Sequence, residues 1–272
     1  MGGRPWEQDG HREQRRRWFD GVADDYDAAR PRYPSALFDD LEALGALRPS
    51  AHVLEVGAGS GQATADLADR AGRVTAVELG PNLAGLARRH FAATASVEIV
   101  EGDALELALP AGGFDLVASG TAWHWLPTDR AVPWAHERLV PGGWLATWWH
   151  VFGDDRGRPD PFGDAVSPLL DRLFPSRASS SGPFALDRQA RVAELTAGDR
   201  FGSVTERRYE WEGRHDADEL RRLWSTWSTD HELRAAEHLE VLDAVEHLAR
   251  NDFDDLVVRP YVTVLYAARR RP

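Results

Sequence analysis

The chain has 272 residues, 43% of them hydrophobic and 28% charged, which is ordinary for a globular protein able to bury a substantial core. Its net charge of -12 at pH 7 argues against a general nucleic-acid binder, because such proteins gain affinity from cationic contacts to phosphate. The absence of cysteine excludes disulfides, thiolate metal sites and cysteine nucleophiles. No apolar run approaches the ~18 residues of a membrane span, and the N-terminus lacks the apolar core of a signal peptide. We therefore expect a cytoplasmic protein without a membrane or nucleic-acid partner.

The first two predicted elements are helices. Apolar side chains recur at helical spacing over residues 11–30, and Pro31 ends this segment. A second helix is expected over residues 35–47. Between residues 53 and 149, short apolar segments alternate with helical ones, which indicates βαβ units and hence a parallel sheet with helices on both faces. The strands are expected at residues 53–56, 73–78, 97–101, 114–118 and 144–149, with helices at 62–71, 81–93 and 130–139 and a turn at 141–143.

Beyond residue 150 this alternation breaks. Residues 151–183 are rich in Gly, Pro, Ser and Asp, with a short helix expected at 168–173, and residues 216–252 are mostly helical; both are interpreted as insertions. The segments 203–211 and 257–268 are expected to be strands at an antiparallel edge of the sheet. We expect one domain over residues 1–272. Its core comprises about residues 35–150, 185–212 and 256–270, and its substrate cap comprises the helix 11–30 and the insertions 151–183 and 216–252.

The strand Val53–Val56 runs directly into Gly57, Gly59 and Gly61, and a helical segment follows. Glycine can adopt positive φ and, having no Cβ, lets a ligand lie against the backbone. The free N–H groups at the start of the next helix favour an anionic ligand group. A strand, a glycine turn and a helix in this order predict the first unit of a nucleotide-binding α/β sheet.

Two acidic residues follow later strands, at the edge of the sheet where open α/β folds bind ligands. Glu78 ends the second strand, and its separation from Gly61 is near the ~20 residues at which an acidic group reaches ribose hydroxyls. The alternative for Glu78 is an ordinary surface carboxylate. Asp103 follows the third strand and could accept a hydrogen bond from an exocyclic amine such as that of adenine. Its alternative is a helix cap before Ala104.

These motifs, in this order, resemble those of the class I S-adenosylmethionine (SAM)-dependent methyltransferases. The matching segments are Glu55–Gly61, Glu78, Gly102–Ala104, Phe114–Val117 and Leu139–Gly143. Two further segments, Tyr26–Pro34 and Ala122–Trp125, resemble the small-molecule subset related to trans-aconitate and ubiquinone-pathway methyltransferases.

The resemblance implies a Rossmann-like, seven-stranded, mostly parallel sheet whose last strand is antiparallel, with helices on both faces and helical cap insertions. It implies SAM as the cofactor and S-adenosylhomocysteine as the product. The cofactor-binding residues that it implies are Glu55, Gly57, Gly59, Gly61 and the backbone at Ser119 for the methionine end, Glu78 for the ribose, and Asp103 with Ala104 for the adenine.

Methyl transfer from a sulfonium is an in-line displacement, so the protein mainly positions donor and acceptor, and a base is needed only if the acceptor must lose a proton. His124 is the first candidate for such a base because it follows the fourth strand; alternatively it only packs and forms hydrogen bonds between Trp123 and Trp125. His150 is the second candidate. Tyr26 is expected to orient the substrate or close the cofactor pocket, with plain packing as the alternative. No histidine pattern indicates a metal site.

The expected activity is SAM-dependent methyl transfer to a small apolar or aromatic metabolite by a monomer or homodimer. The tryptophans of residues 123–149 and 211–227 either line an aromatic substrate pocket or pack in the core. A substrate with a carboxylate also stays open, because the sequence offers Arg30, Arg32, Arg221 and Arg222 as partners for it. One alternative is a SAM-binding protein with a non-methylating, cyclase-like role. Another is a nicotinamide-dependent oxidoreductase, against which the Gly-x-Gly-x-Gly spacing counts. A protein or RNA methyltransferase is disfavoured by the net charge and the capped architecture.

Overall fold

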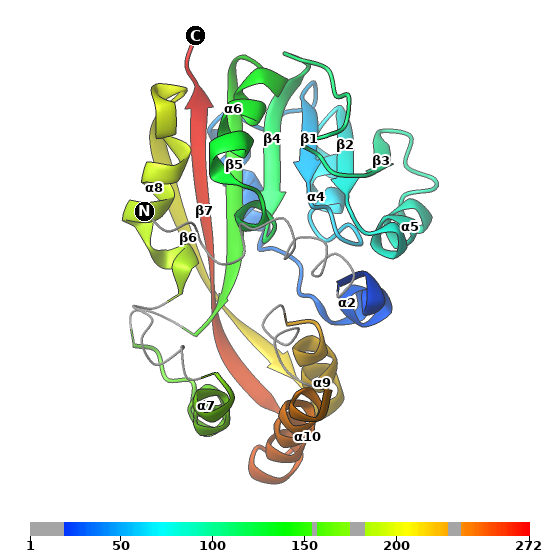
Figure 1. Cartoon of the computed structure of the whole chain (residues 1–272), viewed down its shortest axis with the longest axis vertical. Coiled ribbons are helices and arrows are strands. Elements are labelled where there is room, and N and C mark those ends of the chain that lie inside the picture. The colour runs from blue at the N-terminus through cyan, green and yellow to red at the C-terminus, as the bar shows by residue number, and fades with distance from the viewer. Residues whose placement is uncertain (1–18, 154–156, 175–182, 228–234) are drawn as a thin grey trace.

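The computed structural model describes residues 19–153, 157–174, 183–227 and 235–272. These residues form a seven-stranded sheet with the strand order β3-β2-β1-β4-β5-β7-β6 (Figure 1). Neighbouring strands from β3 to β5 are parallel, whereas β7 pairs antiparallel with both β5 and β6. The predicted mostly parallel sheet with an antiparallel last strand is confirmed. The strands are β1 (His52–Val56), β2 (Arg73–Glu78), β3 (Val97–Glu101), β4 (Phe114–Gly120), β5 (Leu139–Phe152), β6 (Phe201–His215) and β7 (Val257–Arg270).

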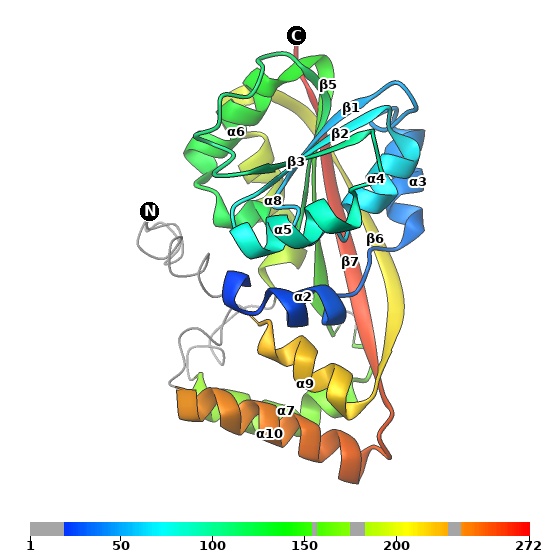
Figure 2. The same ribbon diagram turned by 90° about the vertical axis from the view of Figure 1, so that its right-hand side faces the viewer.

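Helices cover both faces of the sheet, as predicted (Figure 2). On one face Phe38 of α3 packs in the same apolar cluster as Val53 of β1. On the other face Val132 of α6 packs in a second cluster with Leu54, because successive side chains of a strand point to opposite faces. None of the helices in the described ranges is long and apolar enough to cross a membrane. The helices around the sheet are α3 (Ser35–Ala43), α4 (Thr64–Arg70), α5 (Pro81–His90), α6 (Thr128–Arg138) and α8 (Arg188–Leu195).

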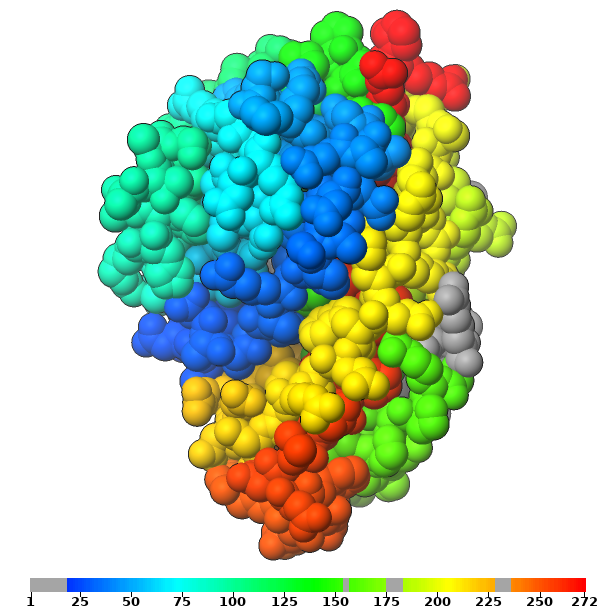
Figure 3. All heavy atoms as spheres, turned by 180° about the vertical axis from the view of Figure 1, so that it is seen from behind, coloured from blue at the N-terminus to red at the C-terminus, as the bar shows by residue number. Residues whose placement is uncertain are grey.

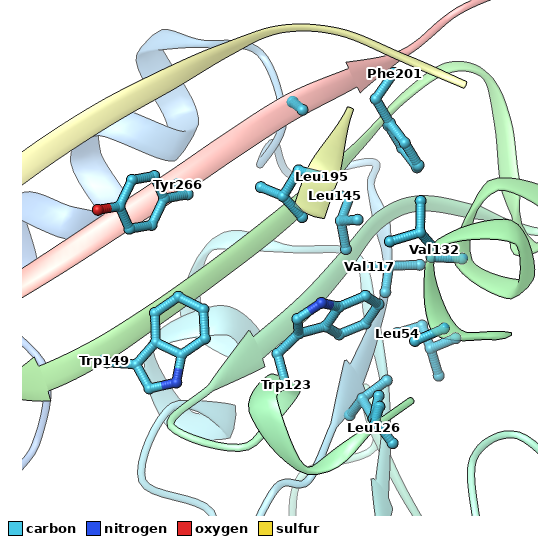
Figure 4. Packing of buried hydrophobic residues seen from close by; sticks show 14 of the residues in the cluster. Leu54, Val117, Trp123, Leu126, Val132, Leu145, Trp149, Leu195, Phe201 and Tyr266 are labelled. Atoms are coloured by element: carbon cyan, nitrogen blue, oxygen red, sulfur yellow. The ribbon is translucent and has the colours of Figure 1, made fainter. Parts of the chain in front are cut away.

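Most tryptophans between residues 123 and 149 are core residues. Trp123 and Trp149 are buried with Tyr266 in the cluster beside α6 and α8 (Figure 4). Trp148 is fully buried on the opposite face, with its ring edge-on to Phe38. For these tryptophans packing, rather than a substrate pocket, is therefore the observed role.

Strand β5 begins earlier than the predicted 144–149. Its first residue, Leu139, already pairs with Phe114 of β4, and the next pair joins Trp144 to Leu116. The residues in between bulge out of the ladder, and Gly142 has φ +77 there. The predicted turn at 141–143 is therefore a bulge within one long strand.

The last two strands extend from the sheet to a separate layer of helices. β6 and β7 have 15 and 14 residues, so each spans about 45–50 Å. Figures 1 and 2 show their far ends beside the cap helices, α7 (Pro161–Leu173), α9 (Ala217–Ser225) and α10 (Ala235–Asp252). Phe162, Trp224 and Val245, one from each of these helices, meet in an apolar cluster. The two predicted insertions thus pack against each other.

Two helices differ in extent from their predictions. α7 begins before the predicted 168–173, because the Asp160 side chain accepts a hydrogen bond from the Gly163 N–H and Pro161 occupies the first turn. In the N-terminal segment, α2 covers Ala23–Ala29 and residues 19–21 are also helical. The remainder of the predicted helix 11–30, up to residue 18, lies outside the described residues.

We expect the ion pair between Asp160 and Arg259 to be important for the stability of the cap helices. It joins α7 to β7, and its side chains are only 14% and 5% exposed. Removing one partner leaves an uncompensated buried charge, so Asp160→Asn should lower the free energy of unfolding by about 3–5 kcal/mol. Urea denaturation measures the change.

The matched control is Glu240→Ala, which breaks the half-exposed ion pair between Arg172 of α7 and Glu240 of α10. Screening by water makes such pairs weak, so this variant should unfold almost like the wild type. Equal losses in the two variants would contradict the importance assigned to the buried pair.

Candidate cofactor and active site

The main cavity lies at the carboxyl ends of β1, β2 and β4, where an open α/β sheet binds its ligand. Counted with the open solvent at its mouth, it measures about 1100 Å³. The predicted site residues that line it are Tyr26, Gly57, Gly59, Glu78, Asp103, Ala104 and His124.

Two residues of the glycine turn are held against neighbouring elements. Gly57 has φ +74, and a Cβ there would lie 2.3 Å from the Cβ of Ala122 in the loop after β4. Gly59 has φ +61, and a Cβ there would lie 3.1 Å from the ring of Tyr26. Both the backbone conformation and the close approach require glycine. The turn therefore presents bare backbone to the cavity.

Glu78 ties this turn to the end of β2. Its Oε2 accepts a hydrogen bond from the Gly59 N–H at 2.9 Å, and its Oε1 accepts one from the Gly80 N–H at 2.8 Å. The side chain is buried, and this burial raises the pKa of its carboxyl group, while the hydrogen bonds from Gly80 and Gly59 oppose the rise. Glu78 is thus a buried carboxylate of the cavity wall, and not the surface carboxylate considered as its alternative.

Asp103 and Ala104 lie in the turn after β3, on the cavity wall. The Oδ1 of Asp103 accepts a hydrogen bond from the Leu105 N–H at 2.9 Å. The residues after Asp103 form a turn and not a helix, so this bond is local to the turn and is not the helix cap considered as the alternative to ligand binding. Asp103 therefore shapes its turn and also lines the cavity, so this local bond and a ligand contact are compatible.

Three predicted cofactor residues are not among the residues that line the main cavity. Glu55 is buried and accepts a hydrogen bond from the Thr64 hydroxyl at 2.6 Å. The Ser119 hydroxyl donates to the Val56 carbonyl at 2.9 Å and so joins β4 to β1, whereas the next residue along the chain lines the cavity. Gly61 packs beneath Phe91, whose ring would be 2.4 Å from an added Cβ.

His124 lies in the short 3₁₀ helix η2 (Trp123–Trp125) after β4 and is mostly buried at the cavity wall. The Trp149 indole Nε1–H donates to its Nδ1 at 2.9 Å. Because Nδ1 accepts this bond, the proton of the neutral imidazole is on Nε2. The Nδ1 lone pair that a base would need is therefore occupied by Trp149, which favours a positioning role over the role of a base.

His150 is not among the residues that line the main cavity; it lines a smaller, inner cavity next to it. Its ring stacks on Tyr33, with 4.4 Å between ring centroids, and its Nδ1 is 2.8 Å from the Thr263 hydroxyl. Burial lowers the pKa of His150 to about 3, so it is neutral at pH 7. Tyr26 lines both cavities, and burial raises the pKa of its phenol.

Several apolar residues of the main cavity were missed from the sequence. Leu79 and Leu83 follow Glu78 closely, and their only signal was this position after a strand end. Phe19 comes from the N-terminal segment and Leu126 follows η2, and nothing in the neighbouring sequence marks either as a cavity residue.

Among the described residues, no group of three or more histidine or acidic side chains could hold a metal ion.

Gly61→Ala tests the packing assigned to the third glycine. The added methyl group would meet Phe91, so we expect a loss of stability about 1–3 kcal/mol greater than that of Gly45→Ala. Gly45 also has positive φ, but nothing lies within 4 Å of its added Cβ. Thermal and urea unfolding measure both. Adding Phe91→Ala should shrink the difference; if Gly61→Ala costs no more than Gly45→Ala, the contact is unimportant.

The pH dependence of stability tests the burial of Glu55, which raises its pKa to about 8 from an ordinary 4.5. Between these values the folded state holds a proton that the unfolded state has lost, so stability falls as the pH rises. Glu55→Gln cannot titrate and keeps an acceptor for Thr64. Its unfolding free energy should therefore fall less than that of the wild type between pH 5.5 and 8.5. The exposed Glu98→Gln is the control, and a wild-type slope in Glu55→Gln would refute the assignment.

Known proteins resemble this chain over the same elements. Residues 54–147 match the family described as a methyltransferase domain. An uncharacterized methyltransferase of Schizosaccharomyces pombe is 26% identical over 91% of this chain and 95% of its own length. The trans-aconitate 2-methyltransferase of Deinococcus radiodurans is 39% identical over 41% of this chain and 43% of its own length. A structure described as that of a type II methyltransferase from Anaeromyxobacter dehalogenans is 27% identical, with a TM-score of 0.62 over 89% of this chain and 99% of that one.

Proposed function

We propose that this chain, which belongs to the class I SAM-dependent methyltransferases, binds SAM in the main cavity and transfers its methyl group to a small molecule. The observation that carries the proposal is the buried carboxylate of Glu78, hydrogen-bonded to the glycine turn at the carboxyl ends of β1 and β2. This family membership sets aside the nicotinamide-dependent oxidoreductase considered from the sequence.

The residues of the cavity suit the parts of SAM. The ribose hydroxyls would donate to Glu78, whose two oxygens retain lone pairs beyond the backbone bonds that they accept. The adenine would lie beside Asp103 and Ala104, and the methionine end along the bare backbone of Gly57 and Gly59. When bound, SAM supplies an activated methyl group on a sulfonium that is its own leaving group.

The walls of the cavity suit an acceptor with an apolar or aromatic body. Phe19 from the N-terminal segment, Trp125 of η2 and Leu126 line the cavity. Phe19 and Trp125 lie with their ring centroids 6.3 Å apart. Large apolar side chains of this kind bind by area and shape, and exclude water from the reacting groups.

The chain contributes mainly by positioning. His124, held by Trp149 at the cavity wall, would contact the acceptor and help to fix its orientation. Holding two reactants in line can supply about 7–11 kcal/mol of the barrier without any base. An acceptor that must lose a proton would then have to release it to water or to another group.

Glu78→Ala should weaken the binding of S-adenosylhomocysteine by about 1.5–3 kcal/mol, because hydrogen bonds to a charged group are lost. Isothermal titration calorimetry measures the affinity. The control is Glu101→Ala, since Glu101 occupies the register position beside Glu78 on β3 but is exposed and pairs with Arg88. Equal affinities in the two variants would remove Glu78 from the site.

The function itself is tested by titrating the wild-type chain with SAM, S-adenosylhomocysteine and NADH. We expect binding of the first two and none of the third; no binding of either adenosyl compound at millimolar concentration would end the proposal. Incubation with methyl-labelled SAM and a panel of small acceptors then separates a methyltransferase from a cyclase-like protein. Label in no product, despite tight SAM binding, would favour the latter.

A further inference from the structure

The inner cavity adjoins the main cavity, with which it shares Tyr26, Arg30 and Thr121 as lining residues. It is also lined by His150 of β5 and Leu223 of α9. It therefore lies between the N-terminal helix α2, the sheet and a cap helix. The two cavities thus share part of their walls, and Arg30 belongs to both.

The inner cavity carries one fixed positive charge and no acidic side chain. Arg30 is the only charged residue among the described residues that line it, although the whole chain has 44 acidic residues against 32 basic ones. Burial keeps His150 neutral and raises the pKa of both Tyr26 and Tyr33, so their phenols stay protonated. The groups around the cavity are thus a guanidinium and neutral hydrogen-bonding partners, which suit an anion.

The guanidinium of Arg30 lies over the ring of Tyr26, 5.0 Å from its centroid, and is hydrogen-bonded to Thr226. Its Nε donates to the Thr226 hydroxyl at 3.0 Å, and its Nη2 donates to the Thr226 carbonyl. Thr226 is fully buried at the end of α9. Arg30 forms no ion pair with any carboxylate of the described residues, and its Nη1 donates no hydrogen bond to them. A partly buried guanidinium without a counterion is costly unless a ligand supplies the charge.

We propose that Arg30 binds a carboxylate of a ligand at the junction of the two cavities, an inference that rests on the SAM-binding function proposed above. A planar guanidinium with free donors matches a carboxylate in geometry as well as in charge. Two ligands present such a group there: SAM itself, through its amino-acid end, and an acceptor that carries a carboxylate. The purely structural alternative is that Arg30 only caps the C-terminus of α9.

Calorimetry with two pairs of probes separates these cases. S-adenosylhomocysteine is compared with 5′-methylthioadenosine, which lacks the amino-acid end, and benzoate is compared with the neutral benzamide in the presence of saturating S-adenosylhomocysteine. The variants are Arg30→Gln, Arg30→Lys and the control Arg32→Gln. Arg32 is exposed and is not among the residues that line either cavity.

If Arg30 binds the carboxylate of SAM, Arg30→Gln should weaken S-adenosylhomocysteine by about 10- to 100-fold and leave 5′-methylthioadenosine unchanged. If it binds the acceptor, both adenosyl compounds should bind as before, and the preference of the wild type for benzoate over benzamide should disappear. Arg30→Lys should recover part of either loss, because it keeps the charge. Arg32→Gln should behave as the wild type throughout.

Within each pair of probes, the ratio of the two affinities distinguishes carboxylate binding from a merely structural effect of the substitution. Thr226→Val removes one hydrogen bond to Arg30 but keeps its charge, so it should lower the melting temperature while preserving the preference for S-adenosylhomocysteine or benzoate. If Arg30→Gln matches Arg32→Gln for all four probes, this inference is overturned while the proposed function stands. If the wild type binds neither adenosyl compound, the proposed function fails instead.

Discussion

The site depends on one buried carboxylate. Glu78 takes hydrogen bonds from the N–H groups of Gly59 and Gly80, and so fixes the turn after β1 to the turn after β2. Burial of this group is unfavourable for its charge, and the two backbone donors offset that cost. The positive φ of Gly57 and Gly59 and their contacts with Ala122 and Tyr26 hold the same turn from the other side. The backbone that would receive a cofactor is therefore ordered before the cofactor arrives, which reduces the entropy cost of binding.

The N-terminal helix α2 connects this turn to the cap helices. Asp20, which precedes α2, accepts a hydrogen bond from the Asn82 N–H in the first turn of α5, and Arg30, which follows α2, donates to Thr226 at the end of α9. Each charge matches the helix end that it meets, acidic at an N-terminus and cationic at a C-terminus. Figure 3 shows the dark blue α2 segment on the surface between the core and the orange cap helices. A displacement of α2 would thus change the walls of both cavities, because Tyr26 and Arg30 line both.

Sequence patterns predicted the parts of this structure that depend on neighbours along the chain. The strand Val53–Val56, the glycine turn and Glu78 follow from local periodicity and from spacing, and all three lie where they were expected. The hydrogen bond from Trp149 to His124 and the one from Arg30 to Thr226 have no such signal, because their partners are 25 and 196 residues apart. The same applies to cavity membership: Glu55 and Gly61 match the motif but pack behind the turn, because tertiary contacts with Thr64 and Phe91 decide their positions.

The central claim is that the cavity beside Glu78 is the SAM site, and a crystal structure of the chain with S-adenosylhomocysteine tests it most directly. The account predicts the ribose hydroxyls within hydrogen-bonding distance of the Glu78 carboxylate, the adenine beside Asp103, and the thioether sulfur facing Trp125 and His124. S-adenosylhomocysteine bound elsewhere, or with its ribose away from Glu78, would contradict it.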